Sequence, residues 1–224
     1  GAVSFFFFSF SGELTPDTSK DSLWITVIND YKAATKLNPG YVDAYIQSAY
    51  IKRRCLLKNL GDPIDDYNAI IKLEPENIEI LNLRGVYKAN KKDFQGAEAD
   101  FNSILALTPK DTLMLQNLIS VELYLQKYND ALAYSDKFIN ECKKKGPGYF
   151  YRGICKSFNK DITGCIEDID RAIELSPAES SYYLNRGYIK ITELKLTEDG
   201  CKDLKMAKEF GDSQAQGLLD QYCK

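Results

Sequence analysis

The 224-residue sequence contains no histidine, which removes the side chain most often used as a general base and as a metal ligand. It has no apolar run near the ~20 residues of a membrane span. It also lacks a Gly-rich phosphate loop, a Gly-x-Ser-x-Gly elbow and a Cys-x-x-Cys pair. The net charge of −3 provides no basic footprint for nucleic acid. We therefore expect no catalytic residues, cofactor, metal, nucleic-acid partner or membrane span.

Three stretches of the sequence align with one another at multiples of 34 residues. They are LNLRGVYKANKKDFQGAEADFNSILALTP (81–109), YFYRGICKSFNKDITGCIEDIDRAIELSP (149–177) and YLNRGYIKITELKLTEDGCKDLKMAKEFG (183–211). Each stretch has a glycine after an arginine, then a polar turn, a small residue and an aspartate. This pattern resembles the tetratricopeptide repeat, a 34-residue unit of two helices, and we identify the chain as a member of that family, of bacterial type.

The resemblance implies an all-α fold, a right-handed α-solenoid of about six helix pairs with a C-terminal capping helix. It would form a single superhelical domain over residues 1–224. Small residues at repeat positions 8 and 20 would let the two helices of a pair approach closely. Prolines at position 32 would end the second helices, because the residue before proline disfavours helical geometry. The repeats are expected near 2–41, 42–77, 78–111, 112–145, 146–179 and 180–211, the capping helix at 212–224, and the prolines are Pro39, Pro75, Pro109 and Pro177.

The segment AVSFFFFSFSGEL, residues 2–14, is the least regular part of the pattern. In repeat register it is predicted to hold the first helix of a divergent repeat one, over residues 2–12, followed by a helix around Trp24 and Tyr31. A remnant of a signal peptide and an extended strand are the alternatives. The chain begins with Gly1 rather than methionine, which favours a bacterial periplasmic or secreted protein over a cytoplasmic one.

Comparison of the repeats with one another reveals arginines and aspartates that occur together. Position 7 is arginine and position 23 is aspartate in repeats three, five and six, and repeat four lacks both. We predict that they form structural ion pairs between the two helices, because Arg–carboxylate pairing is a common structural device. The predicted pairs are Arg84–Asp100, Arg152–Asp168 and Arg186–Asp203.

Position 11 carries a row of lysines. Such a row can present positive charge to an acidic partner, or the lysine stems can cover apolar surface while the ammonium groups reach water. We favour the second interpretation. The lysines are Lys52, Lys88, Lys156 and Lys190.

The six cysteines are predicted to be thiols or disulfides rather than zinc ligands. Cys201 and Cys223 each lie 11 residues from Asp212, at the turn into the capping helix, which places them level across a helical hairpin and predicts a disulfide. Cys155 and Cys165 flank the turn of repeat five in the same way, and they are either a second disulfide or two buried thiols. A disulfide would imply an oxidising compartment.

The family resemblance implies that the first helices line a groove, chiefly through positions 2, 5, 9, 12 and 13. In the C-terminal half these positions are aromatic and apolar, which suits a peptide or helix of a partner protein. The candidate groove residues are Tyr50, Arg53, Arg54, Asn82, Val86, Gln116, Ser120, Tyr124, Phe150, Ile154, Phe158, Leu184, Tyr188 and Ile191.

We therefore expect a non-catalytic scaffold that binds a protein or peptide partner in its groove, as a monomer or weak homodimer. A self-associating structural module and a helical accessory domain of an enzyme complex are the alternatives. Because a fold alone does not fix a function, the choice between them depends on the surface residues.

Overall fold

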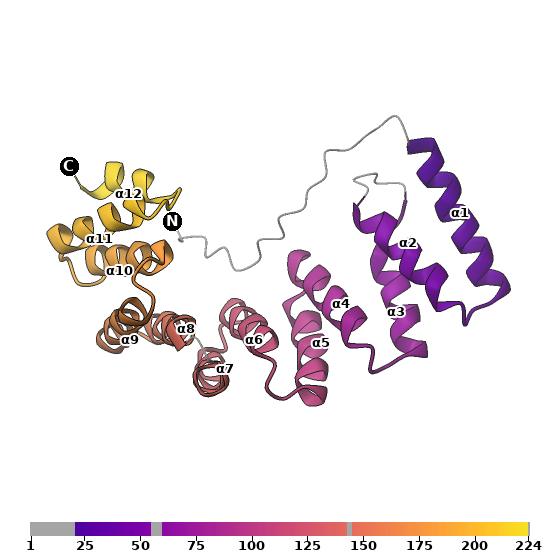
Figure 1. Ribbon diagram of the computed structural model, residues 1–224, viewed down its shortest axis with the longest axis horizontal. Helices are drawn as coiled ribbons and strands as arrows, with labels where there is room; N and C mark the ends of the chain where they lie inside the picture. The colour runs from indigo at the N-terminus through magenta and orange to yellow at the C-terminus, as the bar shows by residue number, and fades with distance from the viewer. Residues whose placement is uncertain (1–20, 55–59, 143–144, 224) are drawn as a thin grey trace. The chain divides into compact units, whose positions relative to one another are not determined.

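The chain consists of α-helices joined by short turns in the computed structural model, which describes residues 21–54, 60–142 and 145–223 (Figure 1). No strand occurs within these ranges, and the all-α prediction is confirmed. The first helix expected at residues 2–12 lies outside the described residues. The helices are α1 (Asp21–Leu37), α2 (Val42–Arg54), α3 (Pro63–Leu73), α4 (Ile78–Asn90), α5 (Phe94–Leu107), α6 (Thr112–Tyr124), α7 (Tyr128–Glu141), α8 (Lys145–Phe158), α9 (Ile162–Leu175), α10 (Ser180–Thr192), α11 (Thr197–Glu209) and α12 (Ala215–Tyr222).

The helices belong to two compact units, an N-terminal unit that ends at Pro109 and a C-terminal unit that begins at Lys110. In the N-terminal unit α1 packs against α2, α2 pairs with α3, and α4 pairs with α5. In the C-terminal unit the pairs are α6 with α7, α8 with α9, and α10 with α11, and α12 packs against α11. Each pair corresponds to one of the expected repeats, although α8 begins one residue before the expected start of repeat five. The single domain over residues 1–224 stays a prediction.

Local sequence signals set the ends of the helices. α3 ends at Leu73 and α9 ends at Leu175, each two residues before a proline, as position 32 of the repeat predicts. The second helices of repeats three and five begin with aspartate caps. The Asp93 carboxylate accepts a hydrogen bond from the amide N–H of Gly96, and Asp161 does the same for Gly164, each at 2.9 Å.

The turn inside each of repeats three to six contains a residue in the left-handed region of backbone space. In repeat three this residue is Lys92, with φ of 65°, and in repeat five it is Lys160, with φ of 63°. Gln126 and Lys195 occupy the equivalent places in repeats four and six. The sequence gives no sign of this conformation, because glycine, its usual marker, is absent from these positions.

Small residues bring the two helices of a pair close together, as positions 8 and 20 predict. In repeat six a Cβ atom added to Gly187 would lie 2.8 Å from the carbonyl oxygen of Gly200. In repeat five a Cβ atom added to Gly153 would lie 3.0 Å from the carbonyl oxygen of Cys165. Backbone therefore packs directly on backbone at these crossings, and any added side chain has to displace it.

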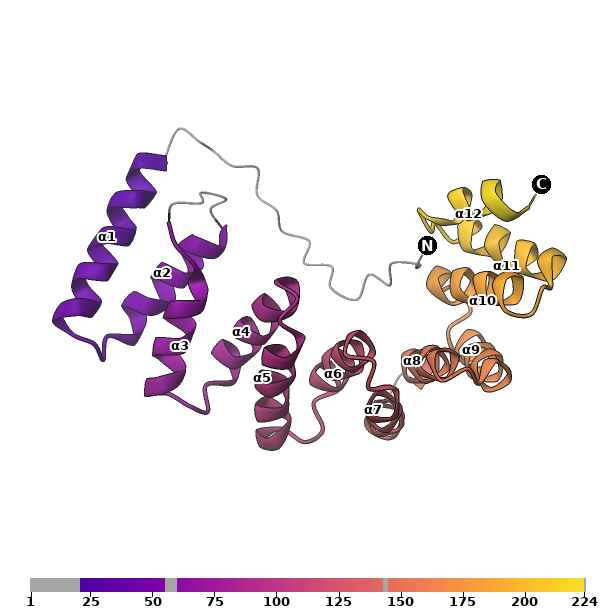
Figure 2. The ribbon, with the colours of Figure 1, turned by 180° about the vertical axis from the view of Figure 1, so that it is seen from behind.

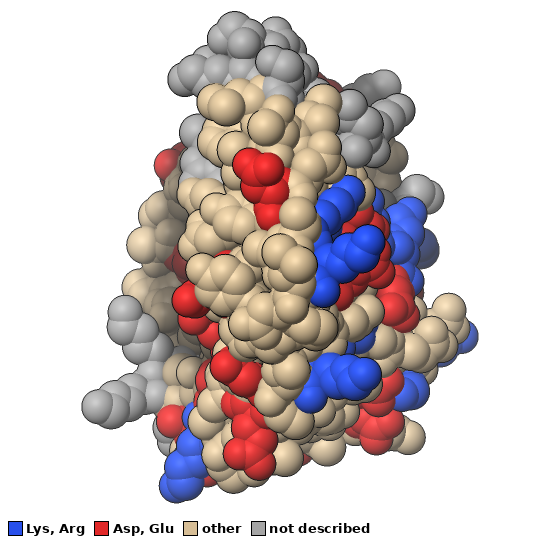
Figure 3. Space-filling view, turned by 90° about the vertical axis from the view of Figure 1, so that its right-hand side faces the viewer, with Lys and Arg blue, Asp and Glu red and all other residues tan. Residues whose placement is uncertain are grey.

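Helix α1 closes the N-terminal unit at one end. It buries Ile28 against Ile51 and Leu60, with Trp24 and Tyr31 packed at the edge of this cluster. Its other face exposes Leu23, and Figure 3 shows uncharged surface there with acidic groups scattered over it and lysine and arginine side chains along one border.

Helix α12 covers the last repeat of the C-terminal unit, beside α11 (Figure 2). Ala215 is fully buried there, and Leu218, Leu219 and Tyr222 pack at the edge of a core cluster that includes Leu204. A terminal helix of this kind shields the last repeat from water, as predicted for residues 212–224.

Candidate functional site

The three predicted arginine–aspartate pairs are present in the structure. In repeat five Arg152 donates through Nε to Oδ2 of Asp168 at 2.9 Å and through Nη2 to Oδ1 at 2.7 Å, a bidentate pair. The other two pairs have the same geometry. All three aspartates are buried, so their charges need these partners. The pairs are Arg84–Asp100, Arg152–Asp168 and Arg186–Asp203.

The lysines at position 11 reach the same aspartates, which corrects our interpretation of them. Lys156 Nζ lies 2.8 Å from Oδ2 of Asp168, and Lys190 Nζ lies 2.9 Å from Oδ2 of Asp203. The ammonium groups therefore end at buried carboxylates instead of in water. Positions 7 and 11 are one helical turn apart, so both side chains can converge on one acid. The lysine–aspartate pairs are Lys52–Asp66, Lys88–Asp100, Lys156–Asp168 and Lys190–Asp203.

Repeat two shows what the arginine contributes. Asp66 has Ser48 in place of arginine and receives hydrogen bonds from Ser48 Oγ at 2.9 Å and Lys52 Nζ at 2.7 Å. Burial is the larger effect there and raises the pKa of Asp66 above its ordinary value. Burial also acts on Asp168, but the hydrogen bonds from Arg152 and Lys156 outweigh it and lower the pKa of that carboxyl.

Each of the three arginines also reaches the preceding second helix. Arg152 donates through Nη1 to Oδ1 of Asp136 on α7 at 2.9 Å, and hydrogen bonds to Asp168 and Asp136 raise the pKa of the guanidinium. The corresponding acceptors are Asn68 for Arg84 and Asp170 for Arg186. These arginines therefore fasten successive repeats to one another, and their donors are engaged within the chain.

A hollow of about 510 Å³ lies beside this network in repeats four and five. Its two cations, Arg152 and Lys156, are already paired with Asp168 and Asp136. Both cations of the hollow are therefore committed to acids of the chain itself. The residues around it are Leu132, Asp136, Arg152, Lys156, Asn159 and Asp161.

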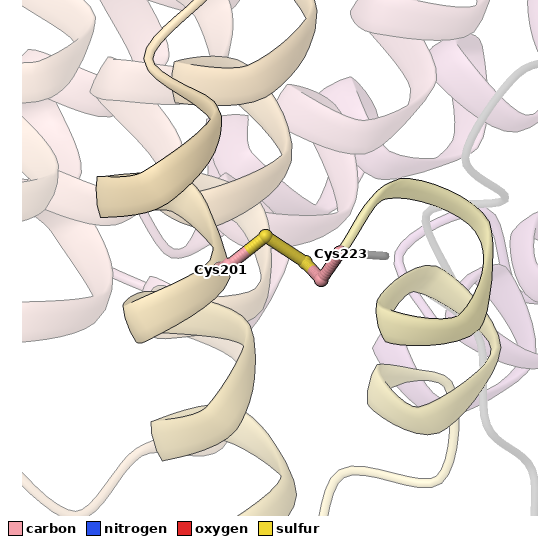
Figure 4. The surroundings of a disulfide bond; sticks show 2 residues. All are labelled: Cys201 and Cys223. Carbon is pink, nitrogen blue, oxygen red and sulfur yellow. A yellow bond between two sulfur atoms is a disulfide. The ribbon is translucent and has the colours of Figure 1, made fainter.

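Cys201 and Cys223 form the predicted disulfide, with Cα atoms 5.8 Å apart (Figure 4). It joins α11 to the end of α12 and closes a loop across 22 positions of sequence. In the chain-entropy account a loop of this length stabilises the folded state by about 3 kcal/mol.

Of the two alternatives for Cys155 and Cys165, the structure has the buried thiols and not the disulfide. Both residues are fully buried thiols, and Cys155 Sγ lies 3.6 Å from Ser135 Oγ on α7. The Cys155 side chain thus faces the preceding repeat instead of Cys165. Equal distances from a turn do not reveal this rotation about the helix axis. Burial raises the pKa of each thiol to about 12 and keeps both protonated.

The candidate groove residues divide by burial. Phe150 is buried, because it stacks on Tyr182 of the next repeat with ring centroids 4.8 Å apart. The prediction that the buried members line the groove is corrected: they pack between helices, and a partner cannot reach them. They are Val86, Ser120, Phe150, Ile154, Leu184 and Ile191.

The other candidate groove residues remain accessible where the structure describes their side chains. Tyr50, Arg53, Tyr124 and Phe158 are exposed, and Asn82, Gln116 and Tyr188 are half-buried. The side chain of Arg54 lies outside the described residues. Tyr124 is 48% exposed and Phe158 is 38% exposed, so both rings are accessible from outside the chain.

The accessible residues of the C-terminal unit lie on α6, α8 and α10. Figures 1 and 2 show these helices on the inner side of the unit, with α7, α9 and α11 on its outer side. We call the accessible residues at groove positions of these three helices the first-helix surface. Its members are Leu113, Gln116, Tyr124, Pro147, Ser157, Phe158, Ser181, Tyr188 and Thr192.

Contacts at the ends of the helices hold parts of this surface in place. Phe158 stacks on Tyr128 of the preceding repeat, with ring centroids 5.5 Å apart and planes 12° from parallel. Beside this stack, Asn159 donates to Oδ1 of Asn129 at 3.2 Å. Phe158 is therefore an exposed ring with a fixed orientation, and little entropy is lost when a partner contacts it.

The described residues give no positive sign of metal or membrane chemistry. No group of three cysteine, aspartate or glutamate side chains among them is placed to hold a metal ion. No described helix combines the length and apolarity needed to cross a bilayer.

Solved structures with the same architecture identify the fold. MamA residues 41–end from Desulfovibrio magneticus RS-1 superposes with a TM-score of 0.61 at 20% identity, over 76% of this chain and 96% of that one. YrrB, a tetratricopeptide-repeat protein with an unusual peptide-binding site, superposes with a TM-score of 0.59 at 16% identity, over 85% and 97%. The fold is therefore that of tetratricopeptide-repeat proteins.

Sequence comparison is consistent with this fold. The human mitochondrial import receptor subunit TOM70 is 24% identical over 155 residues, which are 64% of this chain. The match spans only 25% of TOM70, so it concerns the repeats and not that receptor as a whole. No protein-family model matches the sequence.

Proposed function

We propose that the chain is a non-catalytic interaction scaffold whose C-terminal unit holds a peptide or helix of a partner protein against the first-helix surface. The observation that carries the proposal is the exposure of Tyr124 and Phe158 on two successive first helices. Large aromatic rings on a rigid scaffold are typical of binding hot spots. Tyr188 adds a third, half-buried ring on α10.

Two further observations support binding over catalysis. The buried aspartates of repeats three, five and six are each paired with an arginine and a lysine of the same repeat, so these acids are held in structural ion pairs. YrrB, which shares the fold, has a peptide-binding site.

The N-terminal unit has a second exposed surface. Tyr50 and Arg53 of α2 are exposed at groove positions of repeat two, and we propose them as a separate contact surface.

The Tyr124→Ala/Phe158→Ala variant should lose affinity for a peptide selected on the wild-type chain from a random display library. We expect the Kd, measured by fluorescence anisotropy, to rise at least ~10-fold, because aromatic hot spots contribute about 2 kcal/mol or more each. Circular dichroism should show an unchanged fold, since both rings are on the surface.

Phe210→Ala is the matched control for this variant. Phe210 is 39% exposed and packs on Tyr183 with ring centroids 5.4 Å apart, much as Phe158 packs on Tyr128, but it follows α11 and is not a member of the first-helix surface. Its Kd should stay within about twofold of wild type, the size of a neutral contact. Equal losses in both variants would contradict the proposed site.

A further inference from the structure

The disulfide fastens a short helix whose apolar contact with the rest of the unit is small. α12 has eight residues, and isolated helices shorter than ~12 residues are marginal in water. Its N-cap residue, Gln214, makes no side-chain capping hydrogen bond. Only Ala215 is fully buried, while Leu218, Leu219 and Tyr222 are half-buried. The Cys201–Cys223 bond therefore adds a covalent link to this small apolar contact between α12 and the rest of the unit.

Solvent reaches this disulfide. A hollow of about 660 Å³ opens between α11 and α12 beside Cys223. Its charged residues are two lysines and two acids, Lys205, Lys208, Glu209 and Asp220, so it carries no excess charge, and Cys223 lines it within reach of a small dithiol. By contrast, Cys155 and Cys165 are fully buried, and burial raises the pKa of each thiol to about 12. Those two cysteines are poorly placed for thiol exchange, whereas Cys201–Cys223 is accessible.

The far end of α12 touches the first-helix surface. The ring of Tyr222 meets the ring of Tyr188 on α10 edge to face, with centroids 6.3 Å apart and planes 75° apart. Burial raises the pKa of Tyr188 above its ordinary value. Tyr222 therefore covers part of a residue that a partner would contact.

We propose that the Cys201–Cys223 disulfide is a redox-controlled lock on α12, and that its reduction releases α12 and uncovers Tyr188. A dithiol supplies two electrons and two protons, the bond between the two Sγ atoms breaks to give two thiols, and the dithiol closes to a cyclic disulfide. The consequence for binding rests on the proposed function: reduction enlarges the first-helix surface at α10.

Hydroxyl-radical footprinting read by mass spectrometry tests the lock without a partner. All samples carry Cys55→Ser/Cys142→Ser, which removes the two cysteines that belong neither to the disulfide nor to the buried pair. Three samples are compared: the disulfide form, the form reduced with dithiothreitol and capped with iodoacetamide, and Cys201→Ser/Cys223→Ser. The oxidation rates of Tyr188 and Tyr222 should rise about threefold or more in the second and third samples, as expected for local opening. Tyr182, buried on the same helix, should not change.

Unchanged Tyr188 and Tyr222 rates in both opened samples would overturn the lock. The affinity of the three samples for the library-selected peptide then tests its effect on binding. Tighter binding by the opened samples supports regulation of the site. Equal affinities, with the Tyr124→Ala/Phe158→Ala loss still present, overturn the regulation and leave the proposed function standing. If no peptide binds any sample, the proposed function fails. The footprinting rates of Tyr188 and Tyr222 then decide by themselves whether the disulfide holds α12 in place.

Discussion

Gly200→Ala should destabilise the C-terminal unit strongly. A Cβ atom at position 200 would lie 2.6 Å from the carbonyl oxygen of Gly187 and would also overlap Ile191. A carbonyl oxygen belongs to the backbone of α10, so it can move only if the helix moves. We expect a net loss of about 2 kcal/mol in the free energy of unfolding, because overpacking at such a contact outweighs the ~1 kcal/mol gain in helix propensity.

Gly217→Ala provides the matched control, because it makes the same change inside a helix where nothing lies within 4 Å of the added Cβ atom. It should raise stability by up to about 1 kcal/mol through helix propensity alone. Urea unfolding followed by circular dichroism measures both variants. If Gly200→Ala were as stable as Gly217→Ala, α10 and α11 would not approach each other as closely as described.

Asp168→Ala should have the second large effect, a loss of about 3 kcal/mol in the free energy of unfolding. The carboxylate is buried and accepts hydrogen bonds from Arg152, and Lys156 lies 2.8 Å away. Its removal leaves the two cations without the acid they share. Asp136→Ala removes another acceptor of Arg152, but that side chain is 58% exposed, so the loss should stay below about 1 kcal/mol.

The effect of Asp168→Ala should depend on pH. The folded state lowers the pKa of Asp168, so its stabilisation is complete above the ordinary value of about 4 and is lost as the pH falls through the lower folded value. Urea titrations between pH 7 and pH 3 should show the gap between wild type and variant narrowing only below pH ~4. A gap that stays constant down to pH 3 would mean that the ion pairs contribute little.

Self-comparison of the repeats predicts contacts when two positions vary together. Arg152 and Asp168 could be paired from sequence because Leu118 and Tyr134 replace both residues at once in repeat four. The sequence does not assign Lys156 to the same acid, because solvation explains a lysine at a helix surface equally simply. Periodicity identifies the face on which a side chain lies, but it does not show which partner the side chain selects.

The accessibility of residues at the groove positions could not be predicted in the same way. Phe150 and Phe158 are two helical turns apart on one helix, yet only Phe158 is accessible, because Tyr182 of the next repeat covers Phe150. Burial of this kind depends on the neighbouring repeat, which helical periodicity does not describe. Cys155 shows the same limit, since its side chain faces Ser135 of the preceding repeat.

Photo-crosslinking is the most direct test of the central claim that the first-helix surface binds a peptide. A benzophenone amino acid replaces Phe158 of the first-helix surface in one sample and Phe210, which follows α11, in another; the two positions have nearly equal exposure. On irradiation with the library-selected peptide, a crosslink from position 158 and none from position 210 is the predicted result. A crosslink from position 210 with none from position 158 would contradict the claim.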